Sequence, residues 1–306
     1  MGSGRPTPHD FFTKPEQDRM PAAIVRQHAF TSMGTTVALS LDPPPASAAS
    51  IATGLGVAVV EAPRSVSAVD LIERIFAHLD GRFSLFRPES ELSRLAGGSL
   101  DLETSSEELR DLYGQSLAWR QRTHGAFTPH RPDGVIDLNG IVKAEAMRRS
   151  GEALEACGLV SWRLSVGADV LASGNDADGW PWTVTINDPA GRSTPGPPVP
   201  LGTLELRGTR RAVATAGGTG GRDGGDGPHT IWPGGSAVAA AAGDFAQVTV
   251  AANDIITADV LATAIAAGGI ASLHQLTHRW PIDVLAIDHN GGRTATPGMR
   301  AALLQA

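Results

Sequence analysis

Segments with strand character are grouped along this chain rather than alternating regularly with helical segments. Alternating apolar and β-branched residues predict strands at residues 29–41, 162–166, 182–186, 203–206, 212–215 and 247–251. Apolar residues at helical spacing predict helices at residues 69–79, 105–123, 142–157 and from 257 to the glycines at 268–269. This order predicts an α+β protein, because regular βα repeats are missing.

Several helix ends carry recognisable signals. Ser106 is a plausible N-cap for the helix over 105–123, and Ser90 is positioned to cap a short helix. Gly158 is expected to close the helix that ends at Cys157. Thr257 is expected to cap the last helix, which places Asp259 in its first turn.

The composition limits the class of protein. The chain has 306 residues, of which 42% are hydrophobic, so it can bury a sizeable core. Its net charge of −7 argues against nucleic-acid binding, and a single cysteine excludes an intramolecular disulfide. The polar N-terminus has no apolar signal region, and no run of 18 apolar residues predicts membrane insertion. We therefore expect a cytoplasmic protein.

We expect one folded domain with an N-terminal extension. Residues 1–27 are predicted to form a disordered tail, and residues 28–306 the domain. Segments rich in Pro, Ala, Ser and Gly predict insertions at residues 42–63 and 217–228.

Lys143 is one of only two lysines in a chain whose other cationic side chains are arginines. It follows Asp137 by six residues, near the start of a predicted helix. An ammonium is a compact point charge, well suited to a phosphate oxygen or a carbonyl. The alternative is that Lys143 is an ordinary solvated lysine.

Asp259 and Thr263 are four residues apart on one predicted helix face. A carboxylate and a hydroxyl at this spacing suit a hard cation such as Mg²⁺, which prefers oxygen ligands. The alternative is structural: Asp259 compensates the helix dipole, and Thr263 bonds back to a backbone carbonyl. His229 follows a glycine-rich stretch and is by itself a weak signal.

Taken in order, short stretches of the chain resemble the FAD:protein FMN transferase (ApbE-like) family from Ser32 to about Gly269. The matching stretches are 32–35 (SMGT), 83–86 (FSLF), 90–93 (SELS), 125–127 (GAF), 137–143 (DLNGIVK), 166–169 (VGAD), 212–215 (AVAT), His229 with Ile231, and 258–264 (ADVLATA). Each stretch is degenerate alone, but their common order is specific.

The resemblance implies an ApbE-like (T-fold-like) two-lobed architecture, with mixed sheets flanked by helices and a flavin cleft between the lobes. It implies a Mg²⁺-dependent transferase that moves FMN from FAD onto a Thr or Ser hydroxyl of an acceptor protein and releases AMP. By this resemblance, the catalytic residues are His229, Asp259 and Lys143. The FAD contacts are Met33, Phe86, Ala126, Phe127, Thr128, Asp137, Lys143 and Ile231. The Mg²⁺ ligands are the side chains of Asp259 and Thr263 with the carbonyls of Gly140 and Ala262.

The chain departs from the family pattern at several positions. Thr128 and Trp232 stand where the family usually has aspartates, and Ala168 and Ala216 replace a common glycine and serine. The segment between Thr128 and Asp137 is much shorter than is usual in the family. These departures keep two alternatives open: a flavin-binding protein without transferase activity, and an FAD pyrophosphatase.

Overall fold

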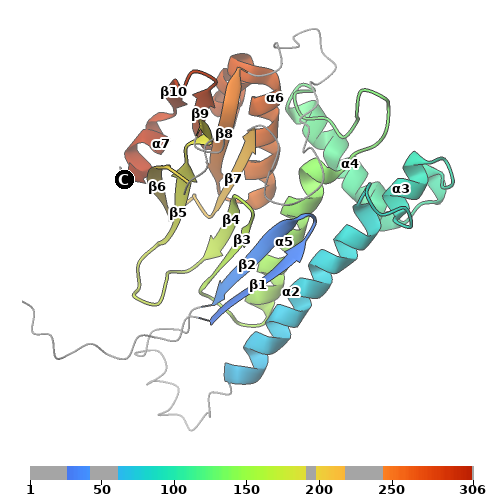
Figure 1. The fold of residues 1–306 in the computed structure, drawn as a ribbon, viewed down its shortest axis with the longest axis horizontal. Helices are drawn as coiled ribbons and strands as arrows, with labels where there is room; N and C mark the ends of the chain where they lie inside the picture. Colours follow the sequence, from blue (N-terminus) through green and yellow to red (C-terminus); the bar gives the residue numbers. More distant parts are fainter. Residues whose placement is uncertain (1–25, 42–60, 191–197, 218–243, 305–306) are drawn as a thin grey trace, which may run out of the picture.

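The computed structural model describes residues 26–41, 61–190, 198–217 and 244–304 (Figure 1). The helices are α2 (Glu61–Phe83), α3 (Glu91–Ala96), α4 (Glu107–Arg122), α5 (Asn139–Ala156), α6 (Ile255–Arg279) and α7 (Pro297–Ala302), with a 3-10 turn at Leu102–Thr104. The strands are β1 (Arg26–Ser32), β2 (Thr35–Leu41), β3 (Trp162–Val166), β4 (Asp169–Ser173), β5 (Trp182–Asn187), β6 (Pro200–Leu206), β7 (Ala212–Gly217), β8 (Phe245–Ala252), β9 (Asp283–Asp288), β10 (Arg293–Ala295) and β11 (Leu303–Leu304).

Two sheets organise the fold. The larger has eight strands in the order β1-β2-β3-β4-β7-β8-β9-β10, and the smaller has the order β11-β6-β5. Every strand pairing in the described residues is antiparallel, so the expected α+β class is confirmed but the expected mixed sheets are not found. In the large sheet, each strand pairs with the next strand along the chain, except that β4 pairs with β7. The strands between them, β5 and β6, belong to the small sheet.

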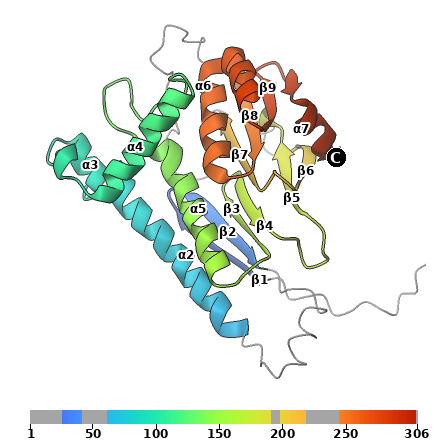
Figure 2. The same cartoon turned by 180° about the vertical axis from the view of Figure 1, so that it is seen from behind.

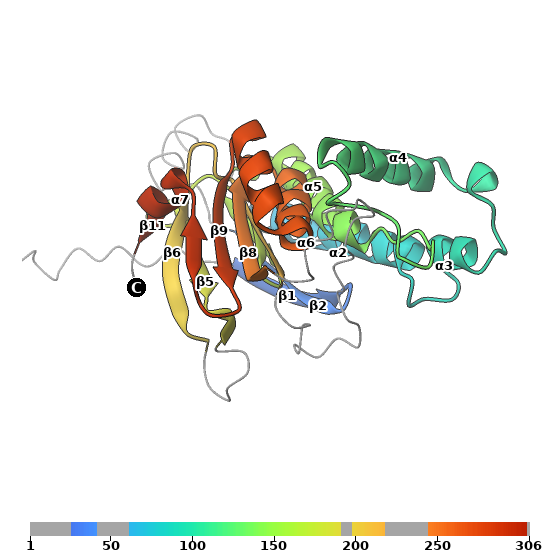
Figure 3. The ribbon, with the colours of Figure 1, turned by 90° about the horizontal axis from the view of Figure 1, so that it is seen from above.

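The molecule has three layers (Figure 3). Helices α2, α5 and α6 cover one face of the large sheet, as the view from behind shows (Figure 2). The small sheet and α7 cover part of the other face. Because successive residues of a strand point to opposite faces, Ala212 and Ala214 of β7 join the helix-side core, while Val213 joins the core against the small sheet.

Close packing fixes α5 over the sheet. Gly151, in the C-terminal half of α5, faces the ring of Trp162 on β3. A Cβ atom added at Gly151 would lie 2.9 Å from Cη2 of Trp162 and 3.2 Å from Cδ2 of Leu171. The absence of a side chain at residue 151 therefore lets α5 approach the strands closely.

Residues 29–41 form a hairpin instead of the single predicted strand. Met33 and Gly34 both have positive φ angles, 52° and 70°, between the paired residues Ser32 and Thr35. Positive φ at both central residues is typical of the tight two-residue turn that suits the twist of a hairpin. The strand pattern continues across this turn, which explains why the prediction merged β1 and β2.

The start of α6 differs from the prediction. Its N-cap is Asp254, whose side chain accepts a hydrogen bond from the Thr257 N–H, so Thr257 already lies inside the helix. Asp259 is therefore in the second turn rather than the first. The glycines predicted to end the helix interrupt it instead: Gly269 has φ 62° and ψ −153°, and a further helical segment continues to Arg279.

The predicted caps of α3 and α4 and the predicted glycine at the end of α5 are confirmed. Ser106 caps α4 by accepting a hydrogen bond from the Leu109 N–H, and Ser90 caps α3 by accepting one from the Ser93 N–H. Helix α5 begins at Asn139, three residues before the predicted start, and Gly158 follows its C-cap with φ 78°.

The expected domain boundaries fall partly outside the described residues. Strand β1 begins at Arg26, so residues 26–27 belong to the sheet rather than to a tail. Helix α2 begins at Glu61, so residues 61–63 are helical rather than part of an insertion, and Gly217 is the last residue of β7.

Helix α6 is long and apolar enough, by length and composition, to cross a membrane. Most of its apolar window is nevertheless buried inside the fold, where α6 packs against β7, β8 and α5. The core helix of a folded domain has the same character, so this feature is weak evidence for a membrane span.

Candidate functional site

An ion pair between α5 and β4 is the centre of the candidate site. Lys143 Nζ lies 2.5 Å from Asp169 Oδ2, and the Asp169 side chain is almost fully buried. Burial lowers the pKa of Lys143, but the negative charges of Asp169 and Asp259 raise it above its ordinary value. Lys143 is therefore a fixed positive charge beside two carboxylates.

Neighbouring strands hold Asp169 in place. Asp169 is the first residue of β4, and its Oδ1 accepts a hydrogen bond of 2.9 Å from the Thr215 N–H on β7. The Thr215 hydroxyl is in turn 3.0 Å from the hydroxyl of Thr249 on β8. The Asp169 carboxylate thus connects α5 to the middle of the large sheet.

Asp259 supplies a second buried carboxylate from α6. It is only 6% exposed, and its Oδ2 has no hydrogen-bond partner among the described residues. Burial raises the pKa of Asp259 to about 7, with Lys143 opposing this shift and Asp169 adding to it. A buried carboxylate oxygen without a partner is energetically costly, and a bound cation would remove that cost.

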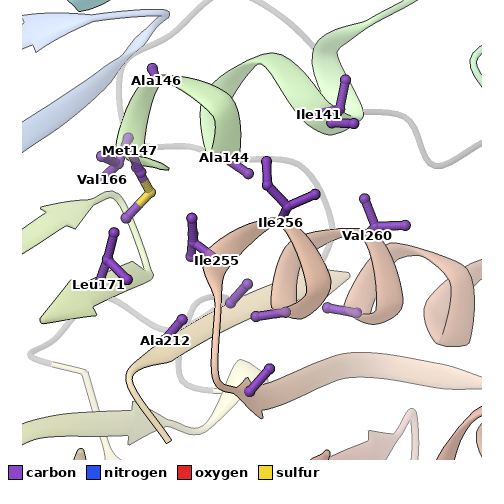
Figure 4. Close-up of a cluster of buried hydrophobic side chains, with 14 of the residues drawn as sticks. Ile141, Ala144, Ala146, Met147, Val166, Leu171, Ala212, Ile255, Ile256 and Val260 are labelled. Atoms are coloured by element: carbon purple, nitrogen blue, oxygen red, sulfur yellow. The ribbon is translucent and has the colours of Figure 1, made fainter. Parts of the chain in front are cut away.

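Apolar side chains pack between α5 and α6, the two helices that carry Lys143 and Asp259. Figure 4 shows Ile141 and Ala144 on α5 facing Ile256 and Val260 on α6. All four side chains are buried. Lys143 directly precedes Ala144, and Asp259 directly precedes Val260, so the packing of α5 on α6 positions both charged residues.

The other predicted Mg²⁺ ligands lie on the same two helices. Thr263 is one turn after Asp259 on α6 and partly buried, Ala262 precedes it, and Gly140 is in the first turn of α5. The described residues contain no cluster of three or more His, Cys, Asp or Glu side chains that could hold a metal. A cation here would depend on Asp259, a hydroxyl and backbone carbonyls, an all-oxygen set that fits Mg²⁺.

The loop before α5 brings four predicted FAD contacts close to this site. The buried Phe127 ring lies over Gly140, where an added Cβ would be 3.0 Å from Cε2, and Ala126 lies beside Gly268 of α6. The Asp137 N–H donates to the Pro129 carbonyl at 2.8 Å, and Asp137 Oδ1 accepts from the Asn139 N–H at 2.9 Å. Thr128 Oγ1 accepts from the His130 N–H.

The remaining predicted site residues do not all lie beside this cluster. Met33 is in the turn between β1 and β2. This turn lies next to the turn between β3 and β4, which precedes Asp169, as the hydrogen bond from the Gly167 N–H to the Thr36 carbonyl shows. Phe86 follows α2 and is 67% exposed. His229 and Ile231 lie outside the described residues.

Two residues of this cluster were not among the predicted site residues. Asp169 and Thr215 belong to the matching stretches 166–169 and 212–215, but the sequence alone assigns neither a role. The signal for Asp169 was an acid directly after a Gly-Ala turn, but only the folded chain shows its pairing with Lys143.

The family model of the ApbE family matches residues 128–286, just over half of the chain. The chain therefore belongs to the ApbE family. No curated protein matches its sequence.

Solved structures share the whole fold at low sequence identity. The flavin transferase ApbE from Vibrio cholerae is 20% identical, with a TM-score of 0.66, over 92% of this chain and 100% of that one. The ApbE protein from Thermotoga maritima is 18% identical, with a TM-score of 0.68, over 91% and 99%. The Pseudomonas stutzeri flavinyl transferase ApbE is 18% identical, with a TM-score of 0.65, over 93% and 99%.

Proposed function

We propose that this chain is a Mg²⁺-dependent FAD:protein FMN transferase. It moves FMN from FAD onto a Thr or Ser hydroxyl of an acceptor protein in the cytoplasm and releases AMP. Membership of the ApbE family supports the reaction class. The observation that carries the proposal is the unpartnered, buried Oδ2 of Asp259 beside the Lys143–Asp169 ion pair.

The residues of the cluster have distinct proposed roles. Asp259 and Thr263, with the carbonyls of Gly140 and Ala262, would hold Mg²⁺, which when bound neutralises negative charge on the pyrophosphate. Lys143 adds a positive charge that Asp169 fixes in position. Phosphoryl transfer depends mainly on such charge neutralisation and on the alignment of the attacking and leaving oxygens.

The proposed transfer forms one bond and breaks another. The acceptor hydroxyl oxygen bonds to the phosphorus of the FMN half, and the bond from that phosphorus to the bridging oxygen breaks. AMP leaves with the bridging oxygen, and the hydroxyl proton is released, with His229 as the proposed general base. The proposed FAD contacts are Met33, Phe86, Ala126, Phe127, Thr128, Asp137, Lys143 and Ile231.

The direct test is incubation of the purified protein with FAD, Mg²⁺ and candidate acceptor proteins. Mass spectrometry is expected to find one FMN on a Thr or Ser of an acceptor, with AMP formed in equal amount. Omitting Mg²⁺ or introducing Asp259→Asn is expected to abolish both products. Asp178→Asn, which changes an exposed acid on the β4–β5 loop, is the matched control and should leave them unchanged.

Two other outcomes would replace the proposal. AMP without an adduct would identify an FAD pyrophosphatase. FAD binding with neither AMP nor an adduct would identify a flavin-binding protein, the alternative suggested by Thr128 and Trp232 in place of the usual aspartates.

A further inference from the structure

A hollow of about 480 Å³ lies on the surface between α3 and the hairpin of residues 129–137. Leu85, Pro88 and Val135 give it apolar walls, and Arg94, Arg131 and Ser99 are among its polar lining. None of these residues belongs to the proposed Mg²⁺ or FAD contacts. Its volume is within the range of small-ligand sites, which is about 300–1,000 Å³.

The hollow has a positive lining in a chain of net charge −7. The residues that line it include two arginines and no carboxylate. The exposed side chain of Arg94 has no ion-pair partner in the described part of the chain, whereas the nearby Arg82 and Arg87 pair with acids. Arg131 Nη2 lies 3.0 Å from Asp133 Oδ2, outside the lining. Arg94 therefore offers a positive charge that the described protein does not neutralise.

The hollow is next to the loops that carry the proposed FAD contacts. Arg131 and Val135 belong to the hairpin that connects Thr128 to Asp137, and this hairpin is closed by a bridge between His130 and Ile136. Leu85 and Pro88 stand on either side of Phe86, which is 67% exposed. A protein that brings a hydroxyl to FAD must dock on a surface close to these loops.

We propose that this hollow binds the segment of the acceptor protein that carries the modified Thr or Ser, and that this segment is acidic. The inference rests on the proposed function and adds the chemistry of its partner. An Asp or Glu of the acceptor pairs with Arg94, and an apolar side chain packs against Leu85, Pro88 and Val135. Charge complementarity of this kind gives specificity and faster association.

The test uses a library of short peptides with a fixed central threonine and randomised flanks, selected for binding to the immobilised full-length protein. The wild type is expected to enrich Asp and Glu. Arg94→Glu is expected to lose that enrichment and to bind selected acidic peptides weaker by on the order of fivefold or more. Arg94→Lys, which keeps the charge, is expected to retain the preference.

The matched control is Arg300→Glu, which reverses an exposed charge on α7, at the opposite end of the molecule from α3 (Figure 3). It should select the same peptides as the wild type. FAD affinity, measured by flavin fluorescence, should be the same in all four proteins because Arg94 is not among the proposed FAD contacts.

The outcomes separate this inference from the proposed function. No acidic enrichment by the wild type, or unchanged enrichment by Arg94→Glu, would overturn it. A loss of FAD affinity in Arg94→Glu would assign the hollow to FAD and also overturn it. Acidic enrichment without any FMN adduct would leave a hollow that binds acidic peptides but would overturn its assignment to a flavin acceptor, together with the transferase. FMN adducts without acidic preference would support the transferase and overturn the acidic docking site.

Discussion

At the scale of single residues, the site depends on where one ammonium lies. Lys143 Nζ is 2.5 Å from a buried carboxylate, and that carboxylate is itself fixed by a backbone N–H. Removing the ammonium would leave Asp169 as an unpaired buried charge, which typically costs about 3–5 kcal/mol. A charge-preserving change is therefore the more informative one.

Lys143→Arg is expected to weaken FAD binding or slow turnover roughly tenfold, which corresponds to about 1.4 kcal/mol. The planar guanidinium is larger than the ammonium and does not fit the same position between Asp169 and Asp259. FAD titrations followed by rate measurements at fixed Mg²⁺ and salt test this. Arg74→Lys, an exposed change on α2, is the control. Equal affinities and rates in Lys143→Arg and wild type would remove Lys143 from the FAD site and leave its ion pair with Asp169 a structural role.

Mg²⁺ is expected to raise the melting temperature of the wild type, because a ligand that binds only the folded state stabilises it. Asp259→Asn should remove this shift while leaving the metal-free protein about as stable, since Asp259 Oδ2 makes no hydrogen bond within the described residues. Thermal melts with and without Mg²⁺ measure both effects. An unchanged Mg²⁺ shift in the variant would remove Asp259 from the metal site.

At the scale of elements, α6 carries Asp259 and Thr263, so its N-terminus matters to the site. Asp254→Ala is expected to cost about 1 kcal/mol, because its side chain caps the helix. Thr257→Ala should cost less, because Thr257 contributes to the cap only through its backbone N–H. Urea unfolding of both variants compares them. A larger loss of stability in Thr257→Ala than in Asp254→Ala would instead identify Thr257 as the N-cap, as the sequence predicted.

Helices α2, α4 and α5 are joined by ion pairs whose acids have lowered pKa values. Burial alone would raise the pKa of Glu145, but hydrogen bonds and positive charge from Arg148 and Arg149 lower it below its ordinary value. The pKa of Glu108 is lowered in the same way, with Arg149 and His78 opposing its burial. Through Glu108, these ion pairs join the Lys143 helix to α4 and α2.

A lowered pKa in the folded state means that the unfolded chain binds more protons in acid. The stability from Glu108 and Glu145 is therefore fully present above the unfolded pKa of about 4.3 and is lost as the pH falls through the folded values. Urea midpoints measured from neutral pH into this range should decrease in the wild type and decrease less steeply in Glu145→Gln. Parallel pH profiles would contradict this role for Glu145.

Local sequence patterns were sufficient to predict the helices that have capping residues and the strands whose buried and exposed residues alternate. Ser106, Ser90 and Gly158 marked their helix ends correctly. Nearly every residue of β4 and β9 is buried, so these strands show no alternation of apolar and polar residues and the sequence did not reveal them. The pairing of Lys143 with Asp169 was beyond sequence reasoning because it depends on long-range packing.

At the scale of the whole molecule, the layers explain why one site collects residues from distant segments. The two helices that carry Lys143 and Asp259 lie on the same face of the large sheet, and Asp169 and Thr215 come from its middle strands. The order of the matching stretches was enough to identify the family. The two-lobed arrangement with a flavin cleft stays a prediction.

The joint between β4 and β7 has a consequence for local unfolding. Val170 and Leu171 pair with Val213 and Ala212 there, whereas β7 pairs with β8 along its whole length. Beyond this short ladder, two further hydrogen bonds join the segments: the Thr215 N–H donates to Asp169, and the Ala172 N–H donates to the Arg211 carbonyl just before β7. Opening the joint would therefore release the partner of Lys143.

If FAD and Mg²⁺ bind only when this joint is closed, they should slow amide hydrogen exchange at Thr215, whose N–H bonds to Asp169, by a factor of 1 + [ligand]/Kd. Exchange in β9, away from the joint, should change less. Equal protection of both strands would show that the joint opens only with global unfolding. Slower exchange confined to β7 would mean that occupancy of the site sets how often the two halves of the sheet separate.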